Sequence, residues 1–495
     1  MEKQAEALSA TAVEAIAGPS LFEQILTNTK VATNPKERVR NMDLLTAFVQ
    51  EVVGDQDKVS LDVIGNIDKR IAELDAVLSE QMNEILHAPE FQKLEGSWRG
   101  LHHLVFNSRT STTLKIRMMP CTKKELLRDF STASEFDQTA LFKKIYEEEY
   151  GMFGGTPYGA LIGDFEFGRE SEDLQLLQEL SHVAAAAHAP FISAASTSMF
   201  GLDSFTDIGK PRDLSKIFDT VEYAQWKSFR QSDDARYVGL VVPHVLGRQP
   251  YGKGGTSIES FAYQEDVDGK NHDKYLWSNA AYSFGTRLTD AFARYGWCAA
   301  IRGVEGGGLV EGLPVHNFYT DEGDVTMKCP TEAPITDRRE KELADLGFIP
   351  LVHCKDTDYA AFFSVQSCQK AKLYDKDAAN ANARLSTQLP YIMAVSRFAH
   401  YLKAMMRDKL GSFMSRTDCE RWLNQWIMNY VTPDDTASTS VKASHPLREA
   451  RIEVSEVPGK PGVYRAVAFL KPHFQLDELS VSLRLVAELP QSTRG

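Results

Sequence analysis

"VYRAVAFLKPHFQLDELSVSLRLVAEL" occupies residues 463–489, close to the end of the 495-residue chain. Within 480–489, Val481, Leu483, Leu485, Ala487 and Leu489 alternate with mostly polar neighbours, as in a half-buried strand. The stretches 463–470 and 480–489 therefore predict a strand pair. Such a pair is marginally stable alone in water, so it must join a larger sheet.

Working back from this pair, "REARIEVSEV" (448–457) and the Gly/Pro turn "PGKPG" (458–462) lead into its first strand. The polar stretch 432–446 predicts a linker. Residues 389–413 and 417–431 read as two amphipathic helices, with Thr417 and Asp418 as candidate caps of the second.

The middle of the chain, from about 95 to 375, mixes strand-like and helix-like stretches. The strand-like runs are 112–119, 158–167, 235–246 and 296–304, and the clearest helix-like run is 171–189. Alternation of the two types predicts an α/β core. With helices before it and strands after it, the fold class is a mixed α/β, α+β protein of several subdomains.

A short amphipathic helix is predicted near the N-terminus. Ser20 and Glu23 form a capping box, and the apolar residues Leu21, Phe22, Ile25 and Leu26 gather on one side of the helix that follows. About two turns are too few to persist alone, so this helix needs a groove in which to bury its apolar side.

Two further helices are predicted before residue 95. One begins at Asn34 and Pro35, and the other runs from Ser60 to about Leu86. The second carries a stripe at three- and four-residue spacing, formed by Ile64, Ile67, Ile71, Leu74, Leu78 and Ile85. Because the pattern lasts only about three heptads, packing against its own domain is favoured over a coiled-coil partner.

Composition narrows the functional classes. The length favours roughly three domains or subdomains, and 43% hydrophobic residues indicate a folded protein. A net charge of −13 argues against nucleic acid as the main partner. No long apolar run predicts a membrane span, and the first 20 residues lack the features of a signal peptide, which favours the cytoplasm. Six cysteines without a C-x-x-C pair favour reduced, mostly buried thiols.

The glycine-rich stretch "RGVEGGGLVEGLP" (302–314) could cradle a phosphate through backbone amides. However, the chain has no G-x-x-x-x-G-K-[ST] motif, so a structural turn is the favoured interpretation. A cytosolic nucleotide-dependent enzyme is the less favoured alternative function.

Other catalytic motifs are missing. There is no H-E-x-x-H, no G-x-S-x-G and no zinc-spaced Cys/His set. His353 adjoins Cys354, but neighbours in sequence seldom face each other, so both are expected to be packed residues. We predict no catalytic residue, no cofactor and no metal site.

Both ends of the chain thus look suited to interactions, with an apolar helix at one end and strands at the other. Strand addition would join molecules through main-chain hydrogen bonds. The residues alone support equally the alternative that both ends fold back onto their own domain.

Several long stretches resemble one family. They are "EFQKLEGSWRGLHHLV", "HVAAAAHAPFI", "DARYVGLVVPHVLGRQPYG", "GWCAAIRGVEGGGLVEGLP", "KCPTEAPITDRREKELADLGFIPLVH", "SRFAHYLKAMMRDKLG" and "YRAVAFLKPHFQLDELSVSLRLVAELP". Together, from about Ser20 to Pro490, they resemble the large subunit of the contractile sheath of type VI secretion systems, the TssC or VipB type.

The resemblance implies a structural, non-catalytic protein. Large subunits of this family pair with a small sheath subunit of the TssB or VipA type and with neighbouring large subunits. They polymerise on a membrane-anchored baseplate in the cytoplasm, around an inner tube of Hcp, and contraction drives tube, spike and effectors into a target cell. The AAA+ ATPase ClpV then disassembles the sheath. A phage-tail-like sheath protein of another contractile injector is the alternative.

The resemblance also implies an organisation into three parts. Residues 1–59 form an arm that carries the ClpV-binding helix (20–32) and contacts the small subunit; residues 60–375 form a helix and the central domain; residues 376–495 form a tube-facing domain. The ClpV-binding residues are Ser20, Leu21, Phe22, Ile25 and Leu26. An intersubunit "handshake" sheet takes strands 463–470 and 480–489, with Val463, Arg465, Val467, Phe469, Val481, Leu483, Leu485 and Leu489. Glu420 and Arg421 are candidates for contact with the inner tube.

Overall fold

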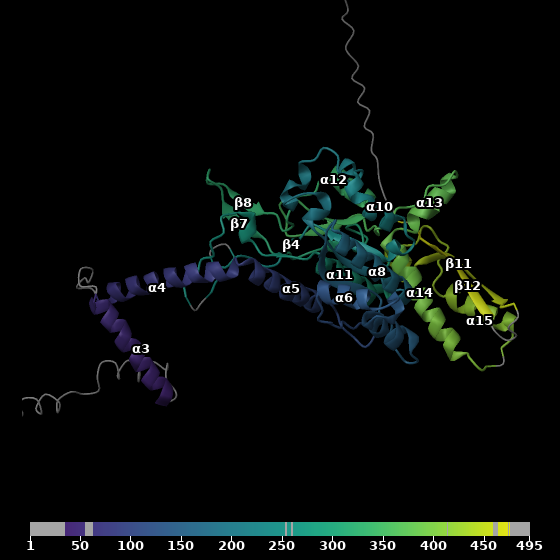
Figure 1. Ribbon diagram of the computed structural model, residues 1–495, viewed down its shortest axis with the longest axis horizontal. Coiled ribbons are helices and arrows are strands. Elements are labelled where there is room, and N and C mark those ends of the chain that lie inside the picture. Colours follow the sequence, from purple (N-terminus) through teal and green to yellow (C-terminus); the bar gives the residue numbers. More distant parts are fainter. Residues whose placement is uncertain are drawn as a thin grey trace, which may run out of the picture. The chain divides into compact units, whose positions relative to one another are not determined.

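The computed structural model describes residues 35–54, 63–252, 255–258, 261–412, 414–458, 464–473 and 475 (Figure 1). The chain divides into two compact units. Among the described residues, the first comprises α3 (Pro35–Gly54), most of α4 (Val63–Leu86), and parts of 257–265. The second comprises the described residues from Ile85 onward, apart from 257–265.

A six-stranded mixed sheet forms the centre of the second unit, which confirms the predicted mixed α/β class. The first four strands in the order are parallel and the last two are antiparallel to their neighbours. In order across the sheet they are β1 (Leu161–Phe167), β2 (Phe191–Ala195), β3 (Val238–Val242), β9 (Phe348–His353), β10 (Ala360–Phe362) and β6 (Leu309–Val310).

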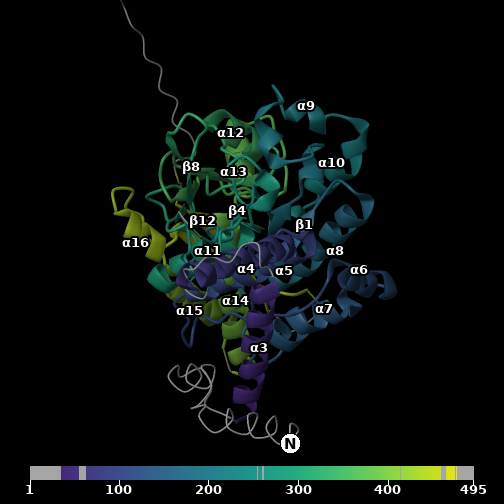
Figure 2. The same ribbon diagram turned by 90° about the vertical axis from the view of Figure 1, so that its left-hand side faces the viewer.

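The sheet is buried on both faces, as β3 illustrates. Its alternate residues Val238, Leu240 and Val242 join the core that contains α8 (Ser171–Ala187), whereas Val241 joins the core that contains α11 (Ala281–Tyr295). This explains why β3 is an unbroken apolar run. On the first face α6 (Lys123–Thr132) and α10 (Ala224–Gln231) pack beside α8, and Figure 2 shows all three on one side of this unit.

A third core lies in the C-terminal part of the second unit. It joins α14 (Leu389–Asp408), α15 (Arg416–Met428), and the antiparallel strands β11 (Leu447–Glu456) and β12 (Tyr464–Pro472). Its buried side chains are Trp297, Phe398, Cys419, Leu423, Ile427, Leu447, Ile452 and Val454. Figure 1 shows α15 beside this strand pair.

The remaining elements are shorter or lie at the periphery. They are α5 (Pro89–Phe106), α7 (Ala140–Phe142), a π-helix (Lys143–Gly151), α9 (Ser215–Phe218), α12 (Asp337–Asp345), α13 (Asp377–Leu385), α16 (Thr439–Ser444), the pair β4 (Val245–Leu246) and β5 (Trp277–Ser278), the pair β7 (His316–Tyr319) and β8 (Val325–Lys328), and several short 3-10 turns.

Four sequence predictions were wrong in detail. Residues 112–119 and 296–304 are not strands, because their backbones have no ladder partner among the described residues. The predicted linker 432–446 contains the helix α16. The cap of α15 is Ser415, whose Oγ accepts the backbone N–H of Asp418 at 3.2 Å, rather than Thr417 or Asp418.

Candidate assembly interface

One edge of the β11–β12 pair is occupied by side chains of α15. The Asn424 carboxamide accepts the Ile452 N–H at 2.9 Å and donates to the Ile452 carbonyl at 2.7 Å. Glu420 accepts the Val454 N–H at 3.2 Å, and Arg416 donates to the Val454 carbonyl at 3.3 Å. Residues 416, 420 and 424 share one helix face, so this face takes the place that a third strand would fill.

The register of the strand pair determines which backbone groups lie along the outer edge of β12. Ile452 lies opposite Ala468, and Val454 lies opposite Ala466. Since Ile452 and Val454 direct their backbone groups toward α15, these are the non-hydrogen-bonded pairs of the ladder. Ala466 and Ala468 therefore point their N–H and C=O groups away from β11. No strand in the described part of the chain pairs with that edge of β12.

The outward face of β12 carries the predicted handshake residues Arg465, Val467 and Phe469. Val467 is 41% exposed and Phe469 is 48% exposed, and the Arg451 guanidinium lies 5.0 Å from the centroid of the Phe469 ring. On the inward face, Ala468 packs against the third core. β12 thus combines an open edge with an exposed, partly apolar face, features that fit a contact surface.

The other predicted residues fall in different places. Glu420 is engaged with β11 inside the chain, and Arg421 is exposed and pairs with Asp418 at 3.2 Å. The rest lie outside the described residues: Ser20, Leu21, Phe22, Ile25, Leu26, Val463, Val481, Leu483, Leu485 and Leu489. Asn424 and Arg416 were not predicted, although their four-residue spacing with Glu420 was visible in the sequence.

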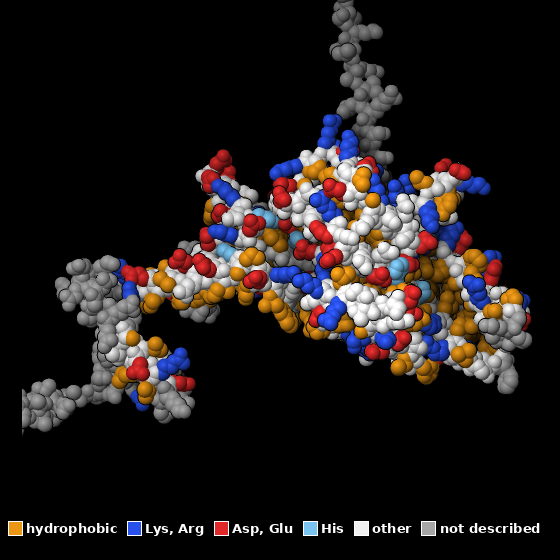
Figure 3. Space-filling view, in the orientation of Figure 1, with side chains coloured by type: hydrophobic (Ala, Val, Ile, Leu, Met, Phe, Trp, Pro, Cys, Tyr) orange, Lys and Arg blue, Asp and Glu red, His pale blue; other side chains and the backbone are white. Residues whose placement is uncertain are grey.

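The described side chains of the apolar stripe on α4 are exposed, so the prediction that the stripe packs against its own domain was wrong. Leu74 is 44% exposed and Leu78 is 46% exposed. The 257–265 segment of the same unit instead meets polar residues of α4, since the Ala262 N–H donates to Asp75 at 3.3 Å. Orange side chains run along α4 in Figure 3. A narrow, uncovered stripe at heptad spacing is typical of a helix that receives a partner helix.

α5 also exposes apolar side chains, notably Leu94 and Trp98. On the opposite side of α5, two glycines allow close packing against Trp277 and Tyr282. A Cβ on Gly100 would lie 2.2 Å from the Tyr282 ring, and one on Gly96 would lie 3.0 Å from the Trp277 carbonyl oxygen. The glycines therefore fix which side of α5 is buried and leave its apolar side uncovered.

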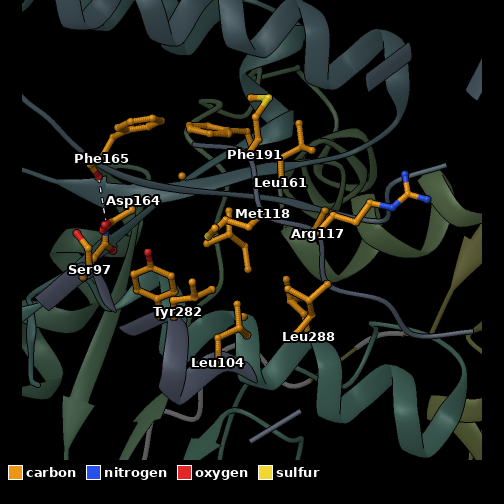
Figure 4. Close-up of a pocket in the computed structure, with 18 of the residues that line it drawn as sticks. Ser97, Leu104, Arg117, Met118, Leu161, Asp164, Phe165, Phe191, Tyr282 and Leu288 are labelled. Atoms are coloured by element: carbon orange, nitrogen blue, oxygen red, sulfur yellow. Dashed lines mark hydrogen bonds between the residues drawn. The ribbon is translucent and has the colours of Figure 1, made fainter. Parts of the chain in front are cut away.

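A cavity of about 2790 Å³ lies within the second unit, between α5, β1, α11 and the extended residues 112–122. Figure 4 shows Leu104, Met118, Leu161 and Leu288 around it. Burial raises the pKa of the Tyr282 hydroxyl, and its hydrogen bond to Asp164 raises it further. A phenol with a raised pKa donates a hydrogen bond and does not act as a base, so this pair does not indicate catalysis.

Two backbone amides of the glycine-rich loop donate hydrogen bonds to carbonyl groups of the same chain. The Gly303 N–H donates to the Phe362 carbonyl at 2.7 Å, and the Gly308 N–H donates to the Gly303 carbonyl at 2.8 Å. Gly303 and Gly307 have φ angles of 72° and 89°, which favour glycine. The loop is accordingly a structural turn that joins α11 to the sheet.

An ion network, in which Glu332 and the two histidines are largely buried and Glu166 is exposed, lies near the C-terminal ends of β1 and β3. His244 contacts Glu332 at 2.5 Å through Nδ1 and Glu166 at 3.1 Å through Nε2, and His272 contacts Glu332 at 3.0 Å. Burial alone would lower the pKa of His244, but the two carboxylates raise it to about 10. Since both ring nitrogens of His244 are engaged, the network stabilises the loops that carry it and offers no free base.

Two negative findings concern the described residues only. No helix among them has the length and hydropathy that crossing a membrane requires. No cluster of three or more His, Cys, Asp or Glu side chains among them could hold a metal ion.

Comparison with known proteins identifies the family. Two models of the EvpB/VC_A0108 sheath proteins match the chain: VipB, the tail sheath N-terminal domain, at residues 68–369, and VipB_2, the tail sheath gpW/gp25-like domain, at residues 378–489. The chain belongs to the VipB family of tail sheath proteins. A relative of this VipB-family chain, the type VI secretion system sheath protein TssC1 of Pseudomonas aeruginosa PAO1, is 52% identical over 438 residues, which cover 88% of each chain.

Solved structures of contractile particles are distant from this VipB-family chain. A chain of the anti-feeding prophage baseplate matches with a TM-score of 0.34 and 9% identity, covering 63% of this chain and 66% of that one. A chain of the contracted helical sheath of the same prophage matches with a TM-score of 0.29 and 11% identity, covering 64% and 75%. At these TM-scores, the matches carry no argument of their own.

Proposed function

We propose that this chain is the large subunit of a type VI contractile sheath, linked to other subunits through the open edge of β12. The single observation that carries the proposal is the asymmetry of the β11–β12 pair. Side chains of α15 occupy the edge of β11, whereas Ala466 and Ala468 direct their backbone groups outward. A strand from another subunit fits that edge by main-chain hydrogen bonding. We assign the stretch 480–489 to the same intersubunit sheet.

A small sheath subunit is the proposed partner of the first unit. The exposed stripe of α4, which includes Leu74 and Leu78, has the spacing of a helix-to-helix seam. An amphipathic helix from the small subunit would bury this stripe. We extend the predicted small-subunit contact from residues 1–59 to α4.

The wider machine follows from the family. The subunit would polymerise on a baseplate in the cytoplasm, around an Hcp tube, and contract to propel tube, spike and effectors. It would do so without catalysis of its own. The 52% identity to a type VI protein favours this system over another contractile injector, and the engaged amides of the glycine loop disfavour a nucleotide-dependent enzyme.

Proline at the open edge tests the proposal. Ala466→Pro removes an N–H that points away from β11, so the ladder with β11 keeps its bonds. Co-expression with the small subunit, followed by negative-stain microscopy, should show tubes for wild type and for the matched control Ala466→Ser, and few or none for Ala466→Pro. Normal tubes from a folded Ala466→Pro protein would refute strand addition at this edge.

A truncation tests the terminal stretch. The truncation keeps Gln475, because its side chain donates to the Ala299 carbonyl at 3.0 Å and its N–H donates to the Tyr391 hydroxyl at 3.2 Å. Removing 476–495 should therefore leave a folded protein that forms no tubes. Tubes of ordinary length would show that 480–489 is dispensable.

The ClpV contact has a separate test. Replacing Leu21 and Ile25 with Asp should spare tube formation but abolish pull-down by the N-terminal domain of ClpV. Retained binding would remove the assignment of Ser20, Leu21, Phe22, Ile25 and Leu26.

A further inference from the structure

One end of the cavity in the second unit carries a guanidinium that forms no ion pair with the described residues. Arg397 of α14 lines this cavity together with Phe292, Trp297, His400 and Tyr401, and we call these five residues the Arg397 corner. The guanidinium carbon lies 4.7 Å from the centroid of the Tyr401 ring and 5.7 Å from that of the Phe292 ring. Its Nε is buried and meets no acceptor in the described part of the chain.

Two further cations of α14 also lack an acidic partner among the residues that the structure describes. The Lys403 ammonium lies 3.4 Å from the centroid of the Tyr150 ring, and Arg407 donates to the Tyr150 carbonyl at 3.1 Å. Glu149, an acid on the cavity wall, is already bonded to Arg117. This part of α14 therefore has an excess of positive charge, which attracts an anion.

His400 adds an acceptor next to the guanidinium. The residue is 4% exposed, and its Nε2 lies 2.9 Å from the Ala187 carbonyl oxygen, which can only accept, so Nε2 carries a hydrogen. Burial lowers the pKa of His400 to about 4, and the charges of Arg397 and Lys403 contribute, so the imidazole is neutral at neutral pH. Its Nδ1 is then an acceptor, and it is buried with no donor among the described residues.

These two groups define the chemistry of a matching ligand. Arg397 and His400 are three residues apart, so they lie on the same face of α14. A guanidinium binds a carboxylate through charge-assisted hydrogen bonds, which are strong in surroundings that exclude water. Nδ1 of His400 requires an O–H or N–H group on the same ligand. The rings of Phe292, Trp297 and Tyr401 favour a ligand with a carbon skeleton over inorganic phosphate.

We propose that the Arg397 corner is a binding site for a carboxylate that carries a neighbouring O–H or N–H group. The carboxylate accepts from Arg397, and the neighbouring group donates to Nδ1 of His400. Two sources offer this chemistry. One is a free hydroxy acid or amino acid, and the other is an acidic residue of a partner polypeptide that enters the cavity. The site adds a ligand to a chain for which the proposed sheath function requires none.

The first test measures binding of small probes to the isolated, folded chain. Saturation-transfer-difference NMR titrations at neutral pH compare lactate with propionate, which has the same carbon chain but no hydroxyl group. Lactate should bind about fivefold more tightly, because only lactate donates to His400. Inorganic phosphate at the same concentration should displace little of the lactate. The absence of a saturable lactate signal, or its displacement by phosphate, would overturn the proposal without any variant.

Variants then test the two residues. Arg397→Met keeps an unbranched apolar side chain against the rings but removes the charge, so it should weaken lactate binding about tenfold. Arg421→Met, which replaces an exposed arginine of α15, is the control and should bind as wild type does. His400→Phe should abolish the preference for lactate over propionate. Unchanged lactate binding in a folded Arg397→Met protein would show that the guanidinium does not hold the carboxylate.

The source of the carboxylate is tested in the complex with the small sheath subunit. If the partner supplies an acidic residue, lactate should no longer bind to the purified complex, and Arg397→Met should weaken co-purification. If lactate binds to the complex as it does to the isolated chain, the source is a free acid. Binding to the isolated chain does not require tubes, so failure of this site and failure of the proposed sheath function give different results.

Discussion

Asn424 binds both backbone groups of Ile452, accepting from its N–H at 2.9 Å and donating to its carbonyl at 2.7 Å. One carboxamide thus reproduces the two hydrogen bonds that a neighbouring strand would make. This pairing explains how the two-stranded sheet can end at β11 without leaving a half-buried edge unsatisfied.

Asn424→Ala should destabilise the protein by about 2 kcal/mol, because the Ile452 N–H and carbonyl lose their partners. It should also increase aggregation, since the edge of β11 becomes available for pairing. Urea unfolding and light scattering measure the two effects. Gln425→Ala, at an exposed position of the same helix, is the control and should change little.

Glu332→Gln should destabilise the protein by about 3 kcal/mol near pH 6, because it breaks the buried network around His244. Burial alone would raise the pKa of Glu332, but His244 and His272 lower it from 4.5 to about 2. Its stabilisation is present above pH 4.5 and is lost as the pH falls toward 2.

The His244 contribution has the opposite sign. It is fully present below pH 6.5 and is lost as the pH rises through about 10. The gap in thermal midpoint between wild type and Glu332→Gln should therefore be widest between about pH 4.5 and 6.5 and narrow on both sides. Glu222→Gln, which breaks an exposed pair with Arg169, should show almost no gap at any pH.

Replacing Leu74 and Leu78 with Lys should leave the isolated chain as stable as wild type, within about 0.5 kcal/mol, because both side chains are already exposed. The same change should abolish co-purification with the small subunit. Ala72→Lys, on the opposite side of α4, should preserve it. Undiminished co-purification of the double variant would place the small-subunit contact elsewhere.

Gly307→Ala should cost about 1–2 kcal/mol, since residue 307 has a φ of 89° and its Cβ would lie 2.4 Å from the Ala300 carbonyl oxygen. Thermal unfolding measures the loss. Gly296→Ala also has a positive φ, but its Cβ would meet nothing within 4 Å, so it should cost less. An equal loss for both variants would mean that the contact with Ala300 adds nothing.

Long periodic segments were predictable. α8 and α14 follow from apolar residues at helical spacing, and β3 follows from a short run without polar residues. Residues 112–119 alternate like a strand, but alternation cannot provide a neighbouring strand, and the segment lines a cavity instead. Periodicity therefore located the long helices and the strands β1 and β3, but it missed the central strands β2 and β9 and did not show which extended segments pair.

The candidate sites depend on residues that are distant in sequence and meet in the fold, and a single sequence does not show which residues meet. Arg465, Val467 and Phe469 were predicted from the family resemblance, which assigns the strand 463–470 to an intersubunit sheet. Asn424 reaches the backbone of Ile452 only because α15 packs along the edge of β11. Likewise, His353 adjoins Cys354 in sequence, but its Nε2 bonds the Thr357 carbonyl at 2.8 Å.

The occupied edge of β11 limits how many copies of this two-stranded sheet can pair edge to edge. Because the edge of β11 is occupied, each strand pair can bond another strand only through β12. Two identical copies that pair through this edge therefore form a dimer with no open edge, and the sheet cannot extend into an amyloid-like ribbon. An ordered filament must then draw its additional strands from other segments, which places its growth under the control of stoichiometry.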